Sequence, residues 1–193
     1  MTPWIKSQTS DRYLAPIRQQ IIDRIPDQSH VWEVGCGTGA LLLEAAPKLK
    51  LGIGWDADPS LIHFANCRRQ KMGIGHIAFE THRVHGTSTP PYPMDLAIAC
   101  LFFHVMPIDA AVEILEQMAM ISSRVIIMGF CQPSTQKQAR LNWLDQRFTG
   151  HYLHFEAYQE AGALAGIIEM ARLNIEDHWH THDESLVCYE LSS

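Results

Sequence analysis

Apolar residues along the chain recur with two periodicities that alternate from one segment to the next. Isoleucines at helical spacing predict a first helix over residues 16–25, with Pro16 in its first turn. Short, continuous apolar runs at residues 31–34, 51–55 and 95–100 are instead typical of strands buried on both faces. This alternation predicts an α/β fold with a mostly parallel sheet.

The later part of the chain continues the same pattern. Further strands are expected at residues 76–81 and 124–128, and two more, at 174–182 and 185–191, are separated only by Asp183-Glu184. So short a connection predicts a hairpin, and the sheet should therefore end with an antiparallel pair. Helices are expected between the strands, over residues 40–46, 59–72, 108–121, 135–147 and 156–172.

Length and composition fit one domain covering residues 1–193. The five cysteines are scattered without a C-x-x-C pair, and the first residues lack a signal-peptide core, which predicts free thiols in a reducing cytoplasm. No apolar run approaches the roughly 18 residues needed to cross a bilayer. A net charge of −6 argues against a nucleic-acid-binding surface. We therefore expect a cytoplasmic monomer or homodimer without membrane or nucleic-acid partners.

Three glycines follow the strand at residues 31–34 at alternate positions, Gly35, Gly37 and Gly39, and a helical pattern starts directly after them. Because glycine has no Cβ, the backbone there can turn tightly and approach a ligand closely. The helix beyond it presents unpaired N–H groups and a partial positive charge. This turn therefore favours binding of a carboxylate or phosphate group.

An acidic residue, Asp56, ends the next strand, 17 residues after Gly39. In a parallel sheet the carboxyl ends of adjacent strands face the same crevice. A carboxylate in that place can accept hydrogen bonds from both hydroxyls of a ribose. Asp56 and the glycine turn together predict a nucleotide-like ligand.

These two features admit two interpretations. Gly35, Gly37 and Ala40 satisfy the looser fingerprint of dinucleotide-binding folds, with an acid about 20 residues further on. Against that interpretation, the third glycine is Gly39, an acid stands two residues before the first glycine at Glu33, and the chain lacks a second domain for the substrate of a dehydrogenase.

The motifs resemble those of a known family. Glu33-Val-Gly-Cys-Gly-Thr-Gly39 resembles motif I of class I S-adenosylmethionine-dependent methyltransferases, and Gly54-Trp-Asp-Ala-Asp-Pro-Ser60 resembles their second motif. Residues 94–104 resemble their fourth strand, which a histidine often follows. The likeness covers roughly residues 10–191. It implies a three-layer α/β/α sandwich around a seven-stranded sheet whose last strand is antiparallel, and S-adenosylmethionine as cofactor.

The resemblance also implies roles for individual residues. The glycines would cradle the methionine part of the cofactor, Glu33 would anchor its amino group, and Asp56 would bind the ribose. Ala57 and Asp58 would border the adenine, and Cys100 would lie at the site as a small buried residue and not as a nucleophile. The residues expected to bind the cofactor are Glu33, Gly35, Cys36, Gly37, Gly39, Asp56, Ala57 and Cys100.

One departure from the family concerns the segment after the strand at residues 76–81. The family often carries an acid there, near the adenine amino group, but residues 81–88 contain neither Asp nor Glu. No adenine contact is therefore expected from a carboxylate in this loop.

Methyl transfer needs positioning of the acceptor and, for an oxygen or nitrogen acceptor, a general base. His104 is the candidate base because it follows the strand at 95–100, at the edge where cofactor and acceptor should meet; a packing role is the alternative. His151, Tyr152 and His154 are candidates for lining the acceptor pocket, with a packed helix–helix connection as the alternative.

Three histidines, His178, His180 and His182, alternate in a predicted strand and share a face that could hold zinc. Acids that would support such ligands are sparse there, so we expect a solvated strand face and no metal. The function expected overall is methyl transfer from S-adenosylmethionine to a small-molecule acceptor. The alternatives are an NAD(P)-dependent oxidoreductase and a catalytically degenerate binding subunit of the same fold.

Overall fold

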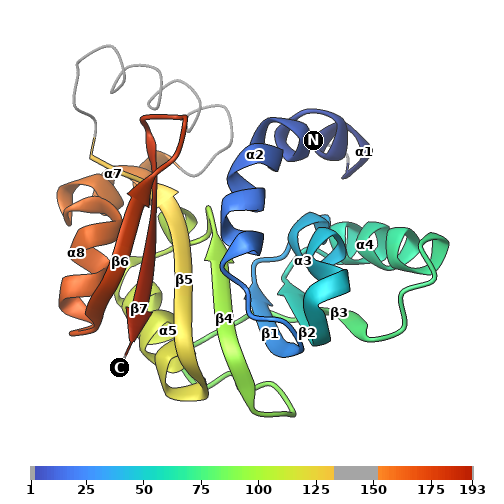
Figure 1. The fold of residues 1–193 in the computed structure, drawn as a ribbon. Coiled ribbons are helices and arrows are strands. Elements are labelled where there is room, and N and C mark those ends of the chain that lie inside the picture. Colours follow the sequence, from blue (N-terminus) through green and yellow to red (C-terminus); the bar gives the residue numbers. More distant parts are fainter. Residues whose placement is uncertain (1–2, 133–151, 193) are drawn as a thin grey trace.

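The structure, a computed structural model, describes residues 3–132 and 152–192. All described strands join one seven-stranded sheet in the order β3-β2-β1-β4-β5-β7-β6 (Figure 1). Within it, β7 runs antiparallel to both β5 and β6, and the other pairs are parallel, which confirms the predicted topology. The strands are β1 (Ser29–Val34), β2 (Leu49–Asp56), β3 (Ile77–Thr81), β4 (Met94–Cys100), β5 (Ser122–Phe130), β6 (Asn174–His180) and β7 (Leu186–Ser192).

Helices cover both faces of the sheet and complete the predicted α/β/α sandwich (Figure 1). Side chains of α2, α3 and α4 form the core on one face, and those of α5, α7 and α8 form it on the other. The helices are α1 (Pro3–Gln8), α2 (Ser10–Asp23), α3 (Ala40–Ala45), α4 (Pro59–Lys71), α5 (Ile108–Ile121), α7 (Tyr152–Glu160) and α8 (Ala163–Met170), with short 3-10 turns η1 (Ala46–Lys48) and η2 (Phe103–Val105).

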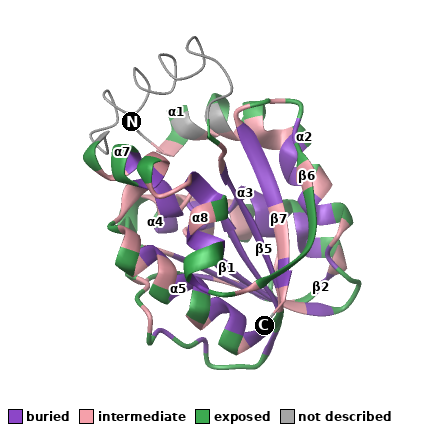
Figure 2. Cartoon of the chain, turned by 90° about the vertical axis from the view of Figure 1, so that its left-hand side faces the viewer, coloured by how far each residue is buried: buried purple, intermediate pink, exposed green. Residues whose placement is uncertain are grey.

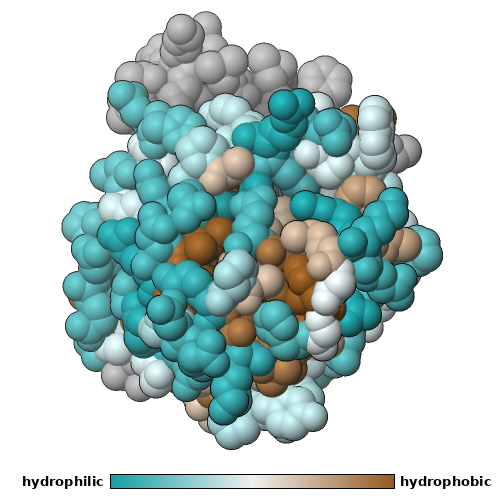
Figure 3. All heavy atoms as spheres, turned by 45° about the vertical axis from the view of Figure 1, so that its right-hand side comes forward, coloured by the Kyte–Doolittle hydropathy of each residue, from teal (hydrophilic) through white to brown (hydrophobic). Residues whose placement is uncertain are grey.

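The central strands are buried on both faces, as their continuous apolar runs predict. In β4, Leu96 and Ile98 join the core under α2 and α3, while Ala97 and Ala99 join the core under α5. By contrast, β6 is an exposed strand at the edge of the sheet (Figure 2). Figure 3 shows a mostly hydrophilic face of the molecule, with apolar residues gathered near its centre.

Two helix predictions were wrong in their bounds. Pro16 lies inside α2, not in its first turn, because the helix begins at Ser10. Tertiary contacts of Asp11 with Thr38 and of Arg18 with Glu44 hold the turns on both sides of the proline. The helix predicted over residues 156–172 is two helices, α7 and α8. They are separated at Gly162, whose φ of 96° is left-handed and ends the first helix.

The histidine face predicted in the final hairpin is interrupted. β6 ends at His180, so His182 lies in the turn before β7, where its ring makes an edge contact with Tyr13 at 6.1 Å between centroids. No group of three or more His, Cys, Asp or Glu among the described residues is arranged to hold a metal ion. Within the same residues, no helix is long and apolar enough to cross a membrane. The helix expected at 135–147, and His151, lie outside the described residues.

Candidate functional site

The glycine turn occupies the carboxyl end of β1. Gly35, Gly37 and Gly39 all have left-handed backbones, with φ of 73°, 53° and 73°. The turn is tied to the neighbouring strand because the N–H groups of Gly35 and Cys36 donate to the main-chain oxygen of Trp55, at 2.8 and 3.0 Å. The backbone therefore folds back on itself over the ends of β1 and β2.

Packing also requires glycine in this turn. A Cβ at Gly35 would lie 2.4 Å from Cδ2 of Phe102, and one at Gly39 would lie 2.6 Å from Cζ of Phe79. Both positions combine a backbone that disfavours side chains with neighbours that leave no room for one. Gly35 and Gly39 are thus required both by the left-handed backbone and by the close approach of the two phenylalanine rings.

Asp56 lies at the end of β2, directly beside the turn. Its Oδ2 accepts a hydrogen bond from the N–H of Gly37 at 2.8 Å, and its Oδ1 accepts from the N–H of Asp58 at 2.9 Å. Asp58 is the N-cap of α4, and its carboxylate accepts from the N–H of Ser60. Ala57 and Asp58 are both exposed. The two motifs therefore meet at the carboxyl ends of β1 and β2.

Glu33 is a buried carboxyl group next to the turn, only 4% exposed. Its Oε2 has no hydrogen-bond partner within the described part of the chain. Burial raises its pKa from 4.5 to about 8; the Arg18 guanidinium opposes this rise, while the carboxylates of Asp56 and Asp11 add to it. Because Arg18 is already bound to Glu44, Glu33 retains an acceptor that a cationic ligand group would satisfy.

Two cysteines complete the predicted set. Cys36 is buried within the turn, and Cys100 is half-buried at the end of β4. Burial raises the pKa of the Cys100 thiol well above its ordinary value, with the charge of Glu33 adding to the effect. The raised pKa favours the neutral form of the Cys100 thiol.

His104 lies in the short turn η2 after β4 and is 7% exposed. Its ring packs edge-on against Phe130 at 5.0 Å between centroids, with Phe155 and Tyr158 at 6.1 and 6.2 Å. The Tyr158 hydroxyl donates to the main-chain oxygen of Phe130 at 2.6 Å. His104 thus lies in an aromatic cluster at the carboxyl edge of β4 and β5. Of the pocket-lining candidates, Tyr152 and His154 lie in α7, not in a connecting loop.

Two contacts at this edge escape sequence reasoning. The His82 ring stacks on Trp55 at 4.1 Å, and its main-chain N–H donates to the main-chain oxygen of Asp56 at 2.9 Å, in the loop that lacks an acid. Asp11 of α2 accepts a hydrogen bond from the Thr38 hydroxyl inside the turn. Asp11 and Thr38 are 27 residues apart, and no local pattern signals their contact.

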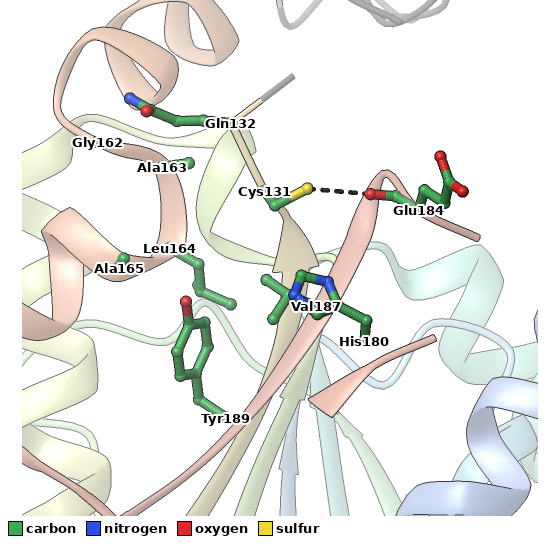
Figure 4. Close-up of a pocket in the computed structure, with 10 residues that line it drawn as sticks. All are labelled: Cys131, Gln132, Gly162, Ala163, Leu164, Ala165, His180, Glu184, Val187 and Tyr189. Atoms are coloured by element: carbon green, nitrogen blue, oxygen red, sulfur yellow. Dashed lines mark hydrogen bonds between the residues drawn. The ribbon is translucent and has the colours of Figure 1, made fainter. Parts of the chain in front are cut away.

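A cavity of about 490 Å³ lies elsewhere, between α8 and the β6–β7 hairpin (Figure 4). Leu164, Val187 and Tyr189 form part of its lining, and the Cys131 thiol donates to the main-chain oxygen of Glu184 at 3.2 Å beside it. None of the residues predicted to bind the cofactor lines this cavity. The hydrogen-bonded glycine turn, and not this hollow, therefore defines the candidate cofactor site.

Comparison with known proteins agrees with this geometry. Residues 31–123, which carry both motifs, match the family model for the methyltransferase domain. No curated protein matches the chain in sequence.

Solved structures extend the likeness to nearly the whole chain. Magnesium protoporphyrin IX methyltransferase from Synechocystis PCC 6803, with SAH bound, matches with a TM-score of 0.66 and 21% identity over 97% of this chain and 83% of its own. N-methyltransferase NodS from Bradyrhizobium japonicum WM9 matches with a TM-score of 0.66 and 17% identity, over 94% of this chain and 97% of its own. A SAM-dependent methyltransferase from Aquifex aeolicus matches with a TM-score of 0.67 and 11% identity, over 99% of this chain and 98% of its own. At such identities the likeness shows a common fold.

Proposed function

We propose that the chain is a class I S-adenosylmethionine-dependent methyltransferase and that it transfers a methyl group from S-adenosylmethionine to a small-molecule acceptor. The observation that carries the proposal is the meeting of three groups at the carboxyl ends of β1 and β2. They are the left-handed glycine turn, the Asp56 carboxylate, and the buried Glu33 oxygen, which has no hydrogen-bond partner among the described residues. Each group complements a different part of that cofactor.

The residues present fit the cofactor chemically. Oε2 of Glu33, which no described residue binds, would accept a hydrogen bond from the cofactor's ammonium group, and this bond would also favour the ionised carboxylate. Asp56 uses one lone pair of each oxygen for Gly37 and Asp58, so each oxygen retains a second one for a ribose hydroxyl. Ala57 and Asp58, exposed after β2, would border the adenine.

The other cofactor contacts proposed are those of the turn itself. Gly35, Gly37 and Gly39 bring the main chain close to the methionine part, and Cys36 and Cys100 fill the space beside it. When bound, S-adenosylmethionine supplies an activated methyl group on a sulfonium sulfur. The chain then has to hold the acceptor in line and exclude water.

His104 is the proposed general base for an acceptor that must lose a proton. It lies at the carboxyl end of β4, which neighbours β1, the strand that carries Glu33. Burial among aromatic rings keeps water away from the imidazole. His104 would therefore accept a proton from a bound acceptor molecule and not from solvent.

The solved relatives support a small acceptor. Two of them are a magnesium protoporphyrin IX methyltransferase, whose structure holds SAH, and the N-methyltransferase NodS. The net charge of −6 disfavours a nucleic-acid substrate. The five free cysteines favour a reducing cytoplasm, and the shared sheet favours action of residues 1–193 as one domain.

Calorimetric titration of the protein with S-adenosylmethionine and with SAH tests the cofactor, with NADPH as the competing ligand. We expect saturable binding of the first two and none of the third. Release of SAH during a screen of small-molecule acceptors tests transfer. Binding of NADPH alone would contradict the proposal in favour of an oxidoreductase.

A further inference from the structure

The glycine turn offers few side chains by which it can be held. Between Gly35 and Gly39 only Cys36 and Thr38 carry one, and only Thr38 carries a hydroxyl. Thr38 is 3% exposed, and its Oγ1 donates a 2.5 Å hydrogen bond to Oδ2 of Asp11 in α2. The Asp11 carboxylate thus binds the only hydroxyl side chain inside the turn.

We propose that Asp11 is a positioning residue that holds the glycine turn in the shape needed to bind S-adenosylmethionine. This role rests on the proposed function. Asp11 acts through Thr38, in the turn's backbone between Gly37 and Gly39. Because the Asp56 carboxylate binds the N–H of Gly37, the turn is held from two sides by two carboxylates of different elements.

A second helix supports the same residue of the turn. Nη1 of Arg68, in α4, donates to the main-chain oxygen of Thr38 at 3.2 Å and lies 3.8 Å from Oδ2 of Asp11. Thr38 is therefore bound through its side chain by α2 and through its main chain by α4. The charge of Arg68 also compensates that of Asp11 within this half-buried group.

Asp11 is itself held in place. Arg18, two turns further along α2, donates through Nη1 to the main-chain oxygen of Asp11 at 2.6 Å and binds both carboxylate oxygens of Glu44 in α3. Tyr13 makes a separate contact that does not involve the Asp11 carboxylate: its hydroxyl donates to Oδ2 of Asp183 at 2.7 Å, in the turn between β6 and β7. The start of α2 thus lies at the same rim of the sheet as the ends of β4 and β5 (Figure 1).

The negative charge of Asp11 also acts electrostatically on Glu33 in the predicted cofactor site. It contributes to the raised pKa of Glu33, together with Asp56, which means that its negative potential extends to the buried carboxyl group. A cationic ligand bound at Glu33 would be attracted by that potential. Loss of the Asp11 charge should therefore weaken binding in addition to loosening the turn.

The test is the affinity for S-adenosylmethionine of Asp11→Asn and Thr38→Val, measured by titration calorimetry well below their melting temperatures. Thr38→Val removes the hydroxyl that donates this hydrogen bond and should bind about tenfold more weakly. Asp11→Asn also removes the charge and should lose at least as much affinity. The double variant should lose little more than Asp11→Asn, because the two changes affect one contact. Thr38→Ser keeps the hydroxyl and should bind as the wild type does.

Two controls separate positioning from general stability. Asp27→Asn removes the same charge at an exposed position, and Tyr13→Phe removes the other hydrogen bond of the same helical turn. Both should retain wild-type affinity. Wild-type affinity in folded Thr38→Val, or an equal loss in Tyr13→Phe, would overturn the role of Asp11. Absence of binding by the wild-type protein would instead refute the proposed function, and this role with it.

Discussion

The main-chain N–H of Gly37 donates a 2.8 Å hydrogen bond to Oδ2 of Asp56, although the two residues are 19 positions apart. This bond joins the turn after β1 to the end of the adjacent parallel strand β2. Because Oδ1 of Asp56 also accepts from the N–H of Asp58, the same carboxylate orders the start of α4. Asp56 therefore shapes the site in addition to presenting acceptors to it.

Replacement of Asp56 should weaken S-adenosylmethionine binding. Asp56→Ala should cost about 2–3 kcal/mol of binding free energy, from the lost charged hydrogen bonds. Asp56→Asn keeps an oxygen acceptor for Gly37 but removes the charge, so its loss should be smaller. Titration calorimetry measures both, with Asp27→Ala as an exposed control. Unchanged affinity in Asp56→Ala would refute its assignment as a ribose ligand.

The raised pKa of Glu33 predicts a pH-dependent stability. Its pKa is about 8 in the folded protein against 4.5 ordinarily, so between these values the folded protein binds more protons than the unfolded chain. The unfolding free energy should therefore fall as pH rises through this window, by up to about 1.4 kcal/mol per pH unit.

Glu33→Gln cannot ionise and should remove that dependence. Urea denaturation of both proteins without ligand, at several pH values across the window, gives the difference in unfolding free energy. We expect Glu33→Gln to gain stability relative to the wild type as pH rises. If the unfolding free energies of the two proteins changed equally with pH, Glu33 would not be the group that causes the pH dependence.

Alanine at Gly35 should destabilise the protein more than alanine at another left-handed glycine. At Gly35 the new Cβ meets the Phe102 ring, whereas at Gly73, with φ of 67°, no atom of a non-adjacent described residue lies within 4 Å of the added Cβ. We expect about 1 kcal/mol for Gly73→Ala, from the backbone alone, and about 2–4 kcal/mol for Gly35→Ala, where crowding is added. Thermal denaturation compares them, and equal losses would argue against the packing requirement.

His104→Gln tests the proposed base. If His104 accepts a proton from the acceptor, kcat should fall by about 10²–10⁴-fold while S-adenosylmethionine affinity stays unchanged. His63→Gln, at an exposed position of α4, serves as the control. SAH release with an acceptor found by screening provides the rate. An undiminished kcat would leave His104 as a packing residue of its aromatic cluster.

The strands and the turn could be predicted from sequence because their signals are local. Residues 95–100 form a continuous apolar run because β4 is covered on both faces, and the run matches Met94–Cys100 closely. The alternating glycines report backbone conformation directly, and all three have positive φ. The start of α2 was predicted too late because Pro16 suggested a helix start where long-range contacts continue the helix.

The surroundings of the turn could not be predicted, since they depend on contacts between distant segments. Nothing near Asp11 indicates that it reaches Thr38, and nothing near Trp55 indicates that His82 stacks on it. His182 was expected to continue a strand because the alternation of residues 178–182 does not reveal where pairing with β7 stops.

The position of β7 has a consequence for assembly of the fold. β7 follows β6 in the chain but lies between β5 and β6 in the sheet. It therefore forms the backbone hydrogen bonds along the edge of β5 that faces away from β4. Until β7 docks, the apolar strand β5 presents an open row of amide and carbonyl groups, which is a template for association with other chains. Shortening or breaking β7 should therefore cause aggregation of the whole domain before it affects ligand binding at the distant turn.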